Sequence, residues 1–103
     1  MPNNEQTTNT EPSALFTKVK LALRISHTAL DSEIQDVIDA ALLSLQKHGV
    51  ATTGYEDDAL IINAVKLYAR WQFNYMNKAD QFEKAWSAAL IVLALCGDYE
   101  EDE

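Results

Sequence analysis

Residues 57–75 read DDALIINAVKLYARWQFNY, and this stretch decides the fold. Its polar side chains recur every three or four residues, which places them on one stripe of an α-helix. The stripe consists of Asn63, Lys66, Arg70 and Asn74. Nearly every other position is apolar or aromatic, and a helix of this kind is buried on more than one side. We therefore predict a central helix here, capped by Glu56 or Asp57 and covered by other helices of the chain or by a neighbouring subunit.

A second amphipathic helix is expected before the central one, from Ala29 or Asp31 to His48. One apolar stripe supports it, made of Leu30, Ile34, Val37, Ile38, Ala41, Leu42 and Leu45. Thr28 or Asp31 is expected to cap its start, and Gly49 has the character of a residue that ends a helix. Leu43 lies opposite the stripe, so it is either a solitary exposed leucine or a contact for another subunit.

Two further helices complete the expected fold. The first covers about Ser13 to Arg24, with Ser13 as its N-cap. The other begins at residues 80–83, DQFE, which resemble a capping box, and it ends at Gly97. Its apolar band includes Trp86 and is wider than one core contact requires. Three side chains widen it, Ile91, Val92 and Leu95.

The scarcity of glycine and proline, with three and two copies, favours long helices over a β fold with many turns. The predicted fold is all-α, a compact bundle of about four helices within residues 13–97. Residues 1–12 are polar and are expected to form a disordered arm. Residues 98–103, DYEEDE, hold five acids in six positions and are expected to form a solvated acidic tail.

The composition disfavours several classes of function. A chain of 103 residues is long enough for one domain. Its net charge is −8, which disfavours sequence-independent binding to DNA or to anionic membranes. No apolar run approaches the ~20 residues that span a bilayer, and residues 1–10 do not resemble a signal peptide. The single cysteine, Cys96, forms no intrachain disulfide and fits a reducing compartment such as the bacterial cytoplasm.

No grouping of residues points to catalysis, a metal or a cofactor, so we expect none of them. His27 and His48 are separated by most of one predicted helix and cannot share a metal ion within a subunit. Cys96 has no evident partner base, so we expect it to be a buried structural thiol. Acidic residues from 31 to 39 fall on the wet face of a helix near its N-terminus, where acids are favoured. Aromatic side chains that could stack on bases lack a basic groove, which favours a core or protein interface.

Several segments resemble phage head–tail connector proteins, also called head-completion adaptors. Residues 18–25, KVKLALRI, match a K-x-x-L-R-I segment, and residues 31–41, DSEIQDVIDAA, match the acids and the I-x-x-x-I-x-x-A helix that follow it in this family. Residues 64–68 and 73–75 resemble the third helix of the family, and residues 82–86 and 93–99 resemble its last helix and end. The resemblance spans about Leu15 to Tyr99 and leaves out the arm.

This resemblance implies a structural subunit of the virion that is made in the host cytoplasm. It would form a ring, expected to be dodecameric like the portal, beneath the portal vertex. The next head-completion or tail protein would bind the ring, and DNA would leave through its lumen without specific binding. A closed ring needs two different adhesive faces on each subunit. The candidate interface residues are Leu43, Lys66, Arg70, Trp71, Tyr75, Trp86, Tyr99, Glu100 and Glu101.

A second hypothesis comes from a different class of protein. An acidic helical regulator that mimics DNA would bind a basic host protein. The net charge of −8 and the acids of residues 98–103 favour it. Lys66 and Arg70 also keep two interpretations, because they either pair with acids of a neighbour or simply solubilise the central helix.

Overall fold

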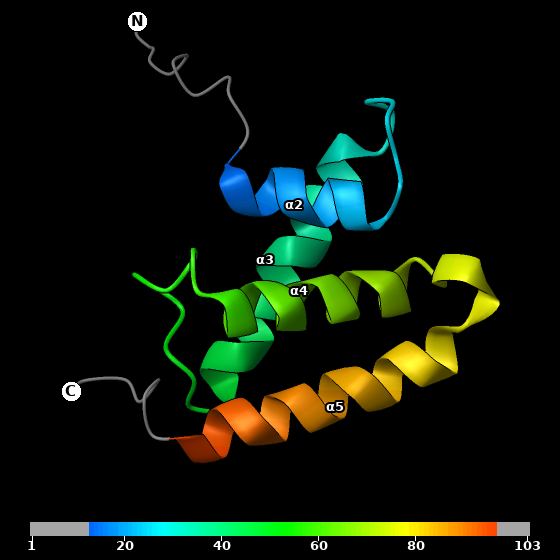
Figure 1. The fold of residues 1–103 in the computed structure, drawn as a ribbon. Helices are drawn as coiled ribbons and strands as arrows, with labels where there is room; N and C mark the ends of the chain where they lie inside the picture. Colours follow the sequence, from blue (N-terminus) through cyan, green and yellow to red (C-terminus); the bar gives the residue numbers. More distant parts are fainter. Residues whose placement is uncertain (1–12, 97–103) are drawn as a thin grey trace, which may run out of the picture.

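The computed structural model describes residues 13–96, which form four α-helices and one short 3-10 helix. The elements are α2 (Ala14–Ala22), α3 (Asp31–Lys47), α4 (Ala59–Gln72), η2 (Tyr75–Asn77) and α5 (Ala79–Cys96). Figure 1 shows α4 in the middle, α2 above it, α5 below it and α3 crossing behind. The prediction of an all-α fold is confirmed. The predicted arm, the acidic tail and Gly97 lie outside the described residues.

The central helix α4 is buried on more than one side, as its sequence predicts. It packs against α2, α3 and α5. Ile61, Val65 and Ala69 have no exposed surface at all. The cover therefore comes largely from the chain's own helices, which was one of the two alternatives left open by the sequence.

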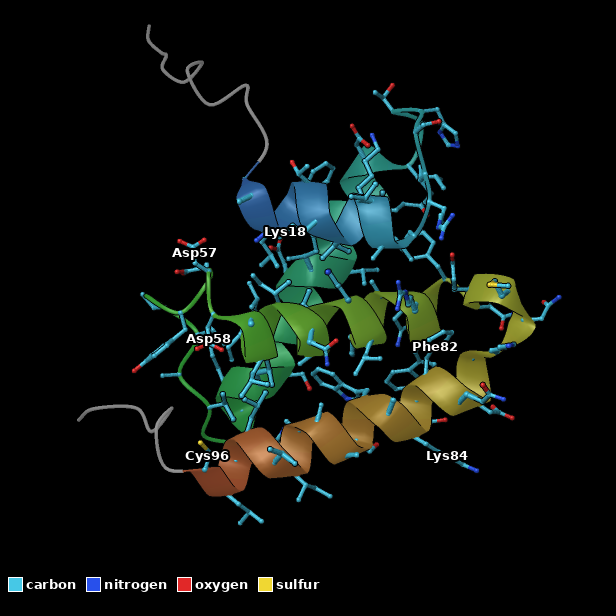
Figure 2. All side chains as sticks on the ribbon, in the orientation of Figure 1. Lys18, Asp57, Asp58, Phe82, Lys84 and Cys96 are labelled. Atoms are coloured by element: carbon cyan, nitrogen blue, oxygen red, sulfur yellow. The ribbon has the colours of Figure 1, made fainter. Side chains whose placement is uncertain are left out.

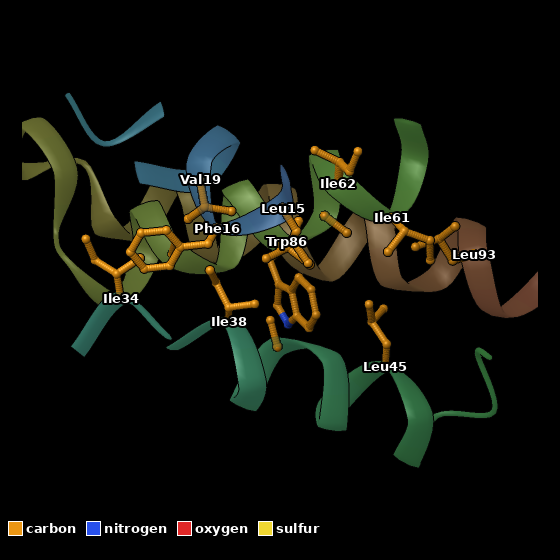
Figure 3. Close-up of a cluster of buried hydrophobic side chains, with 14 of the residues drawn as sticks. Leu15, Phe16, Val19, Ile34, Ile38, Leu45, Ile61, Ile62, Trp86 and Leu93 are labelled. Carbon is orange, nitrogen blue, oxygen red and sulfur yellow. The ribbon is translucent and has the colours of Figure 1, made fainter. Parts of the chain in front are cut away.

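A single hydrophobic core joins the helices (Figure 3). α2 contributes Leu15, Phe16 and Val19, α3 contributes Ile34, Ile38, Ala41 and Leu45, and α5 contributes Trp86 and Leu93. Burying one large aliphatic side chain stabilises a fold by roughly 1.5–3 kcal/mol, so this shared core is the main source of stability.

The starts of α2 and α3 are held by different polar groups. The Phe16 backbone N–H donates to Ser13 Oγ at 3.0 Å, which confirms Ser13 as the N-cap of α2. At α3, however, the predictions of Thr28 or Asp31 as cap are wrong. The N-cap position is Leu30, and it makes no side-chain capping bond. Asp31 is instead the first helical residue, and its carboxylate binds Lys20 Nζ at 2.7 Å. This ion pair joins α2 to α3 and occupies the carboxylate that would otherwise cap.

The end of α3 follows the sequence prediction. Gly49 has a φ of 84°, a left-handed conformation that favours glycine. Its N–H donates to Gln46 O at 3.0 Å, and the Val50 N–H donates to Leu45 O at 2.9 Å. These two bonds form a Schellman motif, which satisfies carbonyl groups left over at the last turn.

The boundaries of α4 and α5 differ from the predictions by a few residues. The N-cap of α4 is Asp58, so the predictions of Glu56 and Asp57 are wrong by one or two positions. α4 ends at Gln72, before a turn in which Asn74 has a φ of 48°. The Ala79 N–H, at the start of α5, donates to Asn74 Oδ1 at 3.2 Å. Asp80 therefore lies inside the first turn of α5, and the capping-box interpretation of residues 80–83 is wrong.

Candidate subunit and partner interfaces

Exposed aliphatic side chains form a ridge on the second half of α5. Ile91 is 58% exposed, Val92 59% and Leu95 80%. These residues recur at spacings of three and four, and so they share one side of the helix with exposed Ala88. The opposite side of α5 carries Trp86 and Leu93 into the core. We call Ala88, Ile91, Val92 and Leu95 the α5 ridge.

A shallow pocket continues the ridge toward α4. Its volume is about 250 Å³, and its lining is Leu60, Asn63, Ala88, Ala89, Val92 and Leu93. Leu60 is itself about half exposed on the first turn of α4. The ridge and the pocket together give an apolar surface that continues from one helix to the next. Contiguous apolar surface of this kind marks sites of protein association.

A second apolar surface lies on a different part of the molecule, at α2 and the loop after it. A groove of about 540 Å³ is lined by Phe16, Thr17, Lys20, Leu21, Ile25, Ser26, Thr28 and Asp31. We call it the α2 groove. Leu21 lines it and is 73% exposed. Lys20 and Asp31 are already paired with each other there, so the two charged groups of the groove satisfy one another.

The aromatic residues predicted at an interface contact the chain's own interior. Trp86 is only 5% exposed, and its ring lies edge-on to Tyr68 with centroids 4.9 Å apart. Trp71 is half-buried, and its ring also lies edge-on to Tyr68, with centroids 5.5 Å apart. Tyr75 is half-buried and lies 6.1 Å from Phe82. These rings stabilise the subunit, and a role at an interface stays a prediction for Trp71 and Tyr75, whose exposed parts reach the surface.

The remaining predicted interface residues occupy different surroundings. Arg70 is engaged within the chain, because its Nε and Nη2 donate to Ala22 O at 3.3 and 3.2 Å. Lys66 is half-buried on the same helix, and Leu43 is about half exposed on α3. Tyr99, Glu100 and Glu101 lie outside the described residues. The members of this set that the structure describes do not come together into one surface.

Sequence reasoning included Leu43 in its set of interface residues but left out the other large, exposed aliphatic side chains. They are Leu21, Leu60, Met76, Ile91, Val92 and Leu95. A signal was present for part of this set, because Ile91, Val92 and Leu95 widen the apolar band of the last helix beyond a single core contact. Leu21 carried no comparable signal, since it lies within a short helix whose other apolar residues have helical spacing.

The charge of the chain is distributed unevenly. Residues 13–96 contain eight Lys and Arg against nine Asp and Glu, a net charge of −1. Most of the net charge of −8 therefore lies in residues 98–103 and 1–12. Residues 13–24 carry three cations, Lys18, Lys20 and Arg24, and no acid. A helical domain so nearly balanced does not present the dense acidic surface that imitation of a DNA backbone requires.

The histidines lie at opposite ends of α3. His27 Nδ1 accepts from the Ala29 N–H at 3.3 Å, and His48 Nδ1 is 2.8 Å from Ser44 O. Among residues 13–96, no three His, Cys, Asp or Glu side chains lie together as metal ligands would. No helix in that range combines the length and the apolar character needed to cross a membrane.

The fold and these surfaces define a class. The chain is a small helical protein whose candidate functional surfaces are exposed apolar patches of the kind that bind other proteins. Residues 15–100 match the family model described as phage connector protein. This match covers most of the chain, and the chain belongs to the phage connector protein family. No curated protein and no solved structure matches the chain. The family is a structural one, so the protein is a structural connector component of a phage virion.

Proposed function

We propose that this connector protein forms a closed ring beneath the portal of a DNA-filled head. The ring has the dodecameric symmetry expected of the portal. It offers a platform for the next head-completion or tail protein, and DNA leaves the head through its lumen. The match to the connector family over residues 15–100 carries this proposal.

The distribution of apolar surface supports assembly into a ring. A closed ring uses heterologous contacts, in which one surface of a subunit meets a different surface of the next. The α5 ridge and the α2 groove are two such different surfaces. α2 and α5 lie on opposite sides of α4, so one copy can offer one surface to each of two neighbours (Figure 1).

The charge distribution supports passage of DNA without capture. A protein binds duplex DNA without regard to sequence by placing cations against phosphates. The chain has 8 Lys and Arg against 16 Asp and Glu, and the cation of Lys20 is already paired with Asp31. A lumen built from such subunits offers a passing duplex little electrostatic attraction.

Binding to heads tests this proposal. DNA-filled heads that contain portal but lack this protein are incubated with the purified chain and recovered by sedimentation. We expect the chain to sediment with these heads in the copy number of the portal and to restore tail joining. Capsid shells without portal serve as the control and bind none. If the chain did not bind portal-containing heads but did bind a basic DNA-binding protein, the result would instead support the DNA-mimic hypothesis.

A further inference from the structure

We propose that the α5 ridge of one copy docks in the α2 groove of the next copy, with the acidic residues 98–103 against the cations of α2. This inference rests on the ring proposed above and names the two surfaces that meet in it. The occupant of each surface is thus a second copy of the same chain.

Shape supports this pairing. The ridge protrudes, since Leu95 is 80% exposed and Ile91 and Val92 flank it on the same side of α5. The α2 groove is concave, with a volume of about 540 Å³. Its apolar wall comes from Phe16, Leu21 and Ile25. Packing of side-chain ridges into grooves is the ordinary way in which helices associate.

The placement of the two surfaces requires a second copy. Lys18 lies on α2 at the upper side of the molecule, and Cys96 ends α5 at the lower side (Figure 2). Because α4 separates α2 from α5, a ridge cannot enter the groove of its own copy while the core stays intact. Each copy carries both surfaces, so the contact repeats head to tail, and such a contact closes into a ring when the rotation between copies divides a full turn.

The two surfaces that pair by shape also carry opposite charges nearby. Lys18 on α2 and Arg24 directly after it are exposed, and neither makes an ion pair with residues 13–96. After Lys84 the chain has no further Lys or Arg, and residues 98–103, which follow the ridge in the sequence, hold five acids. Docking of the ridge therefore brings a strongly acidic segment toward a wholly cationic one. Rim charges of this kind steer association and fix its register.

The main alternative pairing is unfavourable for the same reason. Two ridges could pack against each other in a two-fold dimer. That arrangement would give the dimer two C-terminal segments of five acids each and no matching cationic segment, and like charges at an interface oppose association. A two-fold contact also uses one surface twice and closes at two subunits, so it builds no ring.

Cross-linking on heads tests the contact directly. Cys96→Ser removes the native thiol, and Leu21→Cys and Leu95→Cys are added singly or together in that background. The full chains are bound to portal-containing heads and treated with a short thiol-specific cross-linker. We expect a ladder of covalent multimers from the double variant, monomers from each single variant, and dimers alone from a mixture of the two single variants. Leu43→Cys combined with Leu95→Cys is the matched control and gives no ladder.

The outcomes separate this inference from the ring proposal. Dimers from Leu95→Cys alone would overturn it in favour of ridge-to-ridge packing. A double variant that saturates binding to the heads but yields no covalent multimers would overturn this inference and leave the ring proposal standing. A wild-type chain that does not bind portal-containing heads would overturn the ring proposal and this inference together.

A charge swap tests the ionic part. Lys18→Glu with Arg24→Glu is expected to weaken binding to heads by about tenfold at low salt. Glu100→Lys with Glu101→Lys is expected to weaken it similarly. Combining all four substitutions restores opposite charges across the contact, and we expect most of the affinity to return. A fourfold variant as weak as either double variant would contradict the proposed contact between residues 98–103 and α2.

Discussion

At the scale of single residues, Arg70 joins three parts of the chain. Its guanidinium donates from Nε and Nη2 to the carbonyl oxygen of Ala22, the last residue of α2. The same group lies over the rings of Tyr75 and Phe82, with its central carbon 5.4 and 5.8 Å from their centroids. The last carbonyls of a helix lack intrahelical donors, and a cation there is also favoured by the helix dipole. Arg70 therefore ties the end of α2 to α4 and to the start of α5.

This arrangement predicts that Arg70 and Lys66 are not equivalent, although both belong to one polar stripe. We expect Arg70→Ala to lower the free energy of unfolding by about 1–2 kcal/mol, because a charged hydrogen bond and two cation–π contacts are lost at a partly exposed site. Arg70→Lys is expected to recover only part of this, since lysine lacks the two-donor fork. Urea-induced unfolding measures both values.

The matched control for this prediction is Lys66→Ala. Lys66 makes no hydrogen bond or ion pair that involves the described residues, and its loss is expected to change stability by less than about 0.5 kcal/mol. Equal effects of Lys66→Ala and Arg70→Ala would show that Arg70 only solubilises α4.

At the scale of elements, the helices begin at different kinds of polar contact. α2 and α4 start at side chains that accept backbone N–H groups, Ser13 and Asp58. α3 starts at Asp31, whose carboxylate is bound to Lys20, and the first N–H of α5 donates to Asn74. The contacts at α2, α4 and α5 satisfy N–H groups that a helix leaves without partners in its first turn, whereas the ion pair at α3 satisfies none of them.

The start of α4 gives a second testable pair. Asp58 accepts from the Leu60 N–H at 2.9 Å and from the Ile61 N–H at 3.3 Å. We expect Asp58→Ala to lower the free energy of unfolding by about 1 kcal/mol, the usual cost of losing an N-cap. Asp57→Ala removes the neighbouring, exposed acid and is expected to have almost no effect. Thermal unfolding of both variants measures the two effects. A larger shift of the unfolding midpoint for Asp57→Ala than for Asp58→Ala would contradict the assignment of Asp58 as the N-cap of α4.

The existence and order of the helices were predictable, whereas several of their boundaries were not. Apolar residues at helical spacing reveal a buried face from sequence alone. Adjacent acids at 56–58 are chemically alike, and sequence alone does not show which one takes the cap. The turn between α4 and η2 was missed because Asn74 and Met76 adopt left-handed conformations, which few non-glycine residues do. The contacts of Arg70 with Ala22, 48 residues earlier, and with the ring of Phe82 beyond this turn join distant parts of the sequence and are invisible to local patterns.

At the scale of the whole molecule, the sequence predicted surplus apolar surface and located the part on the last helix, but it misplaced Trp86. Large aromatics were expected outside because they are common interface anchors. Trp86 is instead in the core, where a ring of its size removes the most area from water. The smaller aliphatics Ile91, Val92 and Leu95 remain outside on α5. Periodicity along one helix cannot show which part of a broad apolar band its neighbours cover, because that depends on how the helices cross.

The central claim is that this surplus surface joins copies of the connector protein into a ring at the exit of the head. Electron cryo-microscopy of portal-containing, DNA-filled heads, imaged with and without the added chain, tests it most directly. The account predicts a closed ring of added density beneath the portal, with α5 of each subunit seated against α2 of its neighbour and an open lumen on the axis. Added density as isolated subunits, or no added density at the portal under conditions that saturate binding, would contradict it.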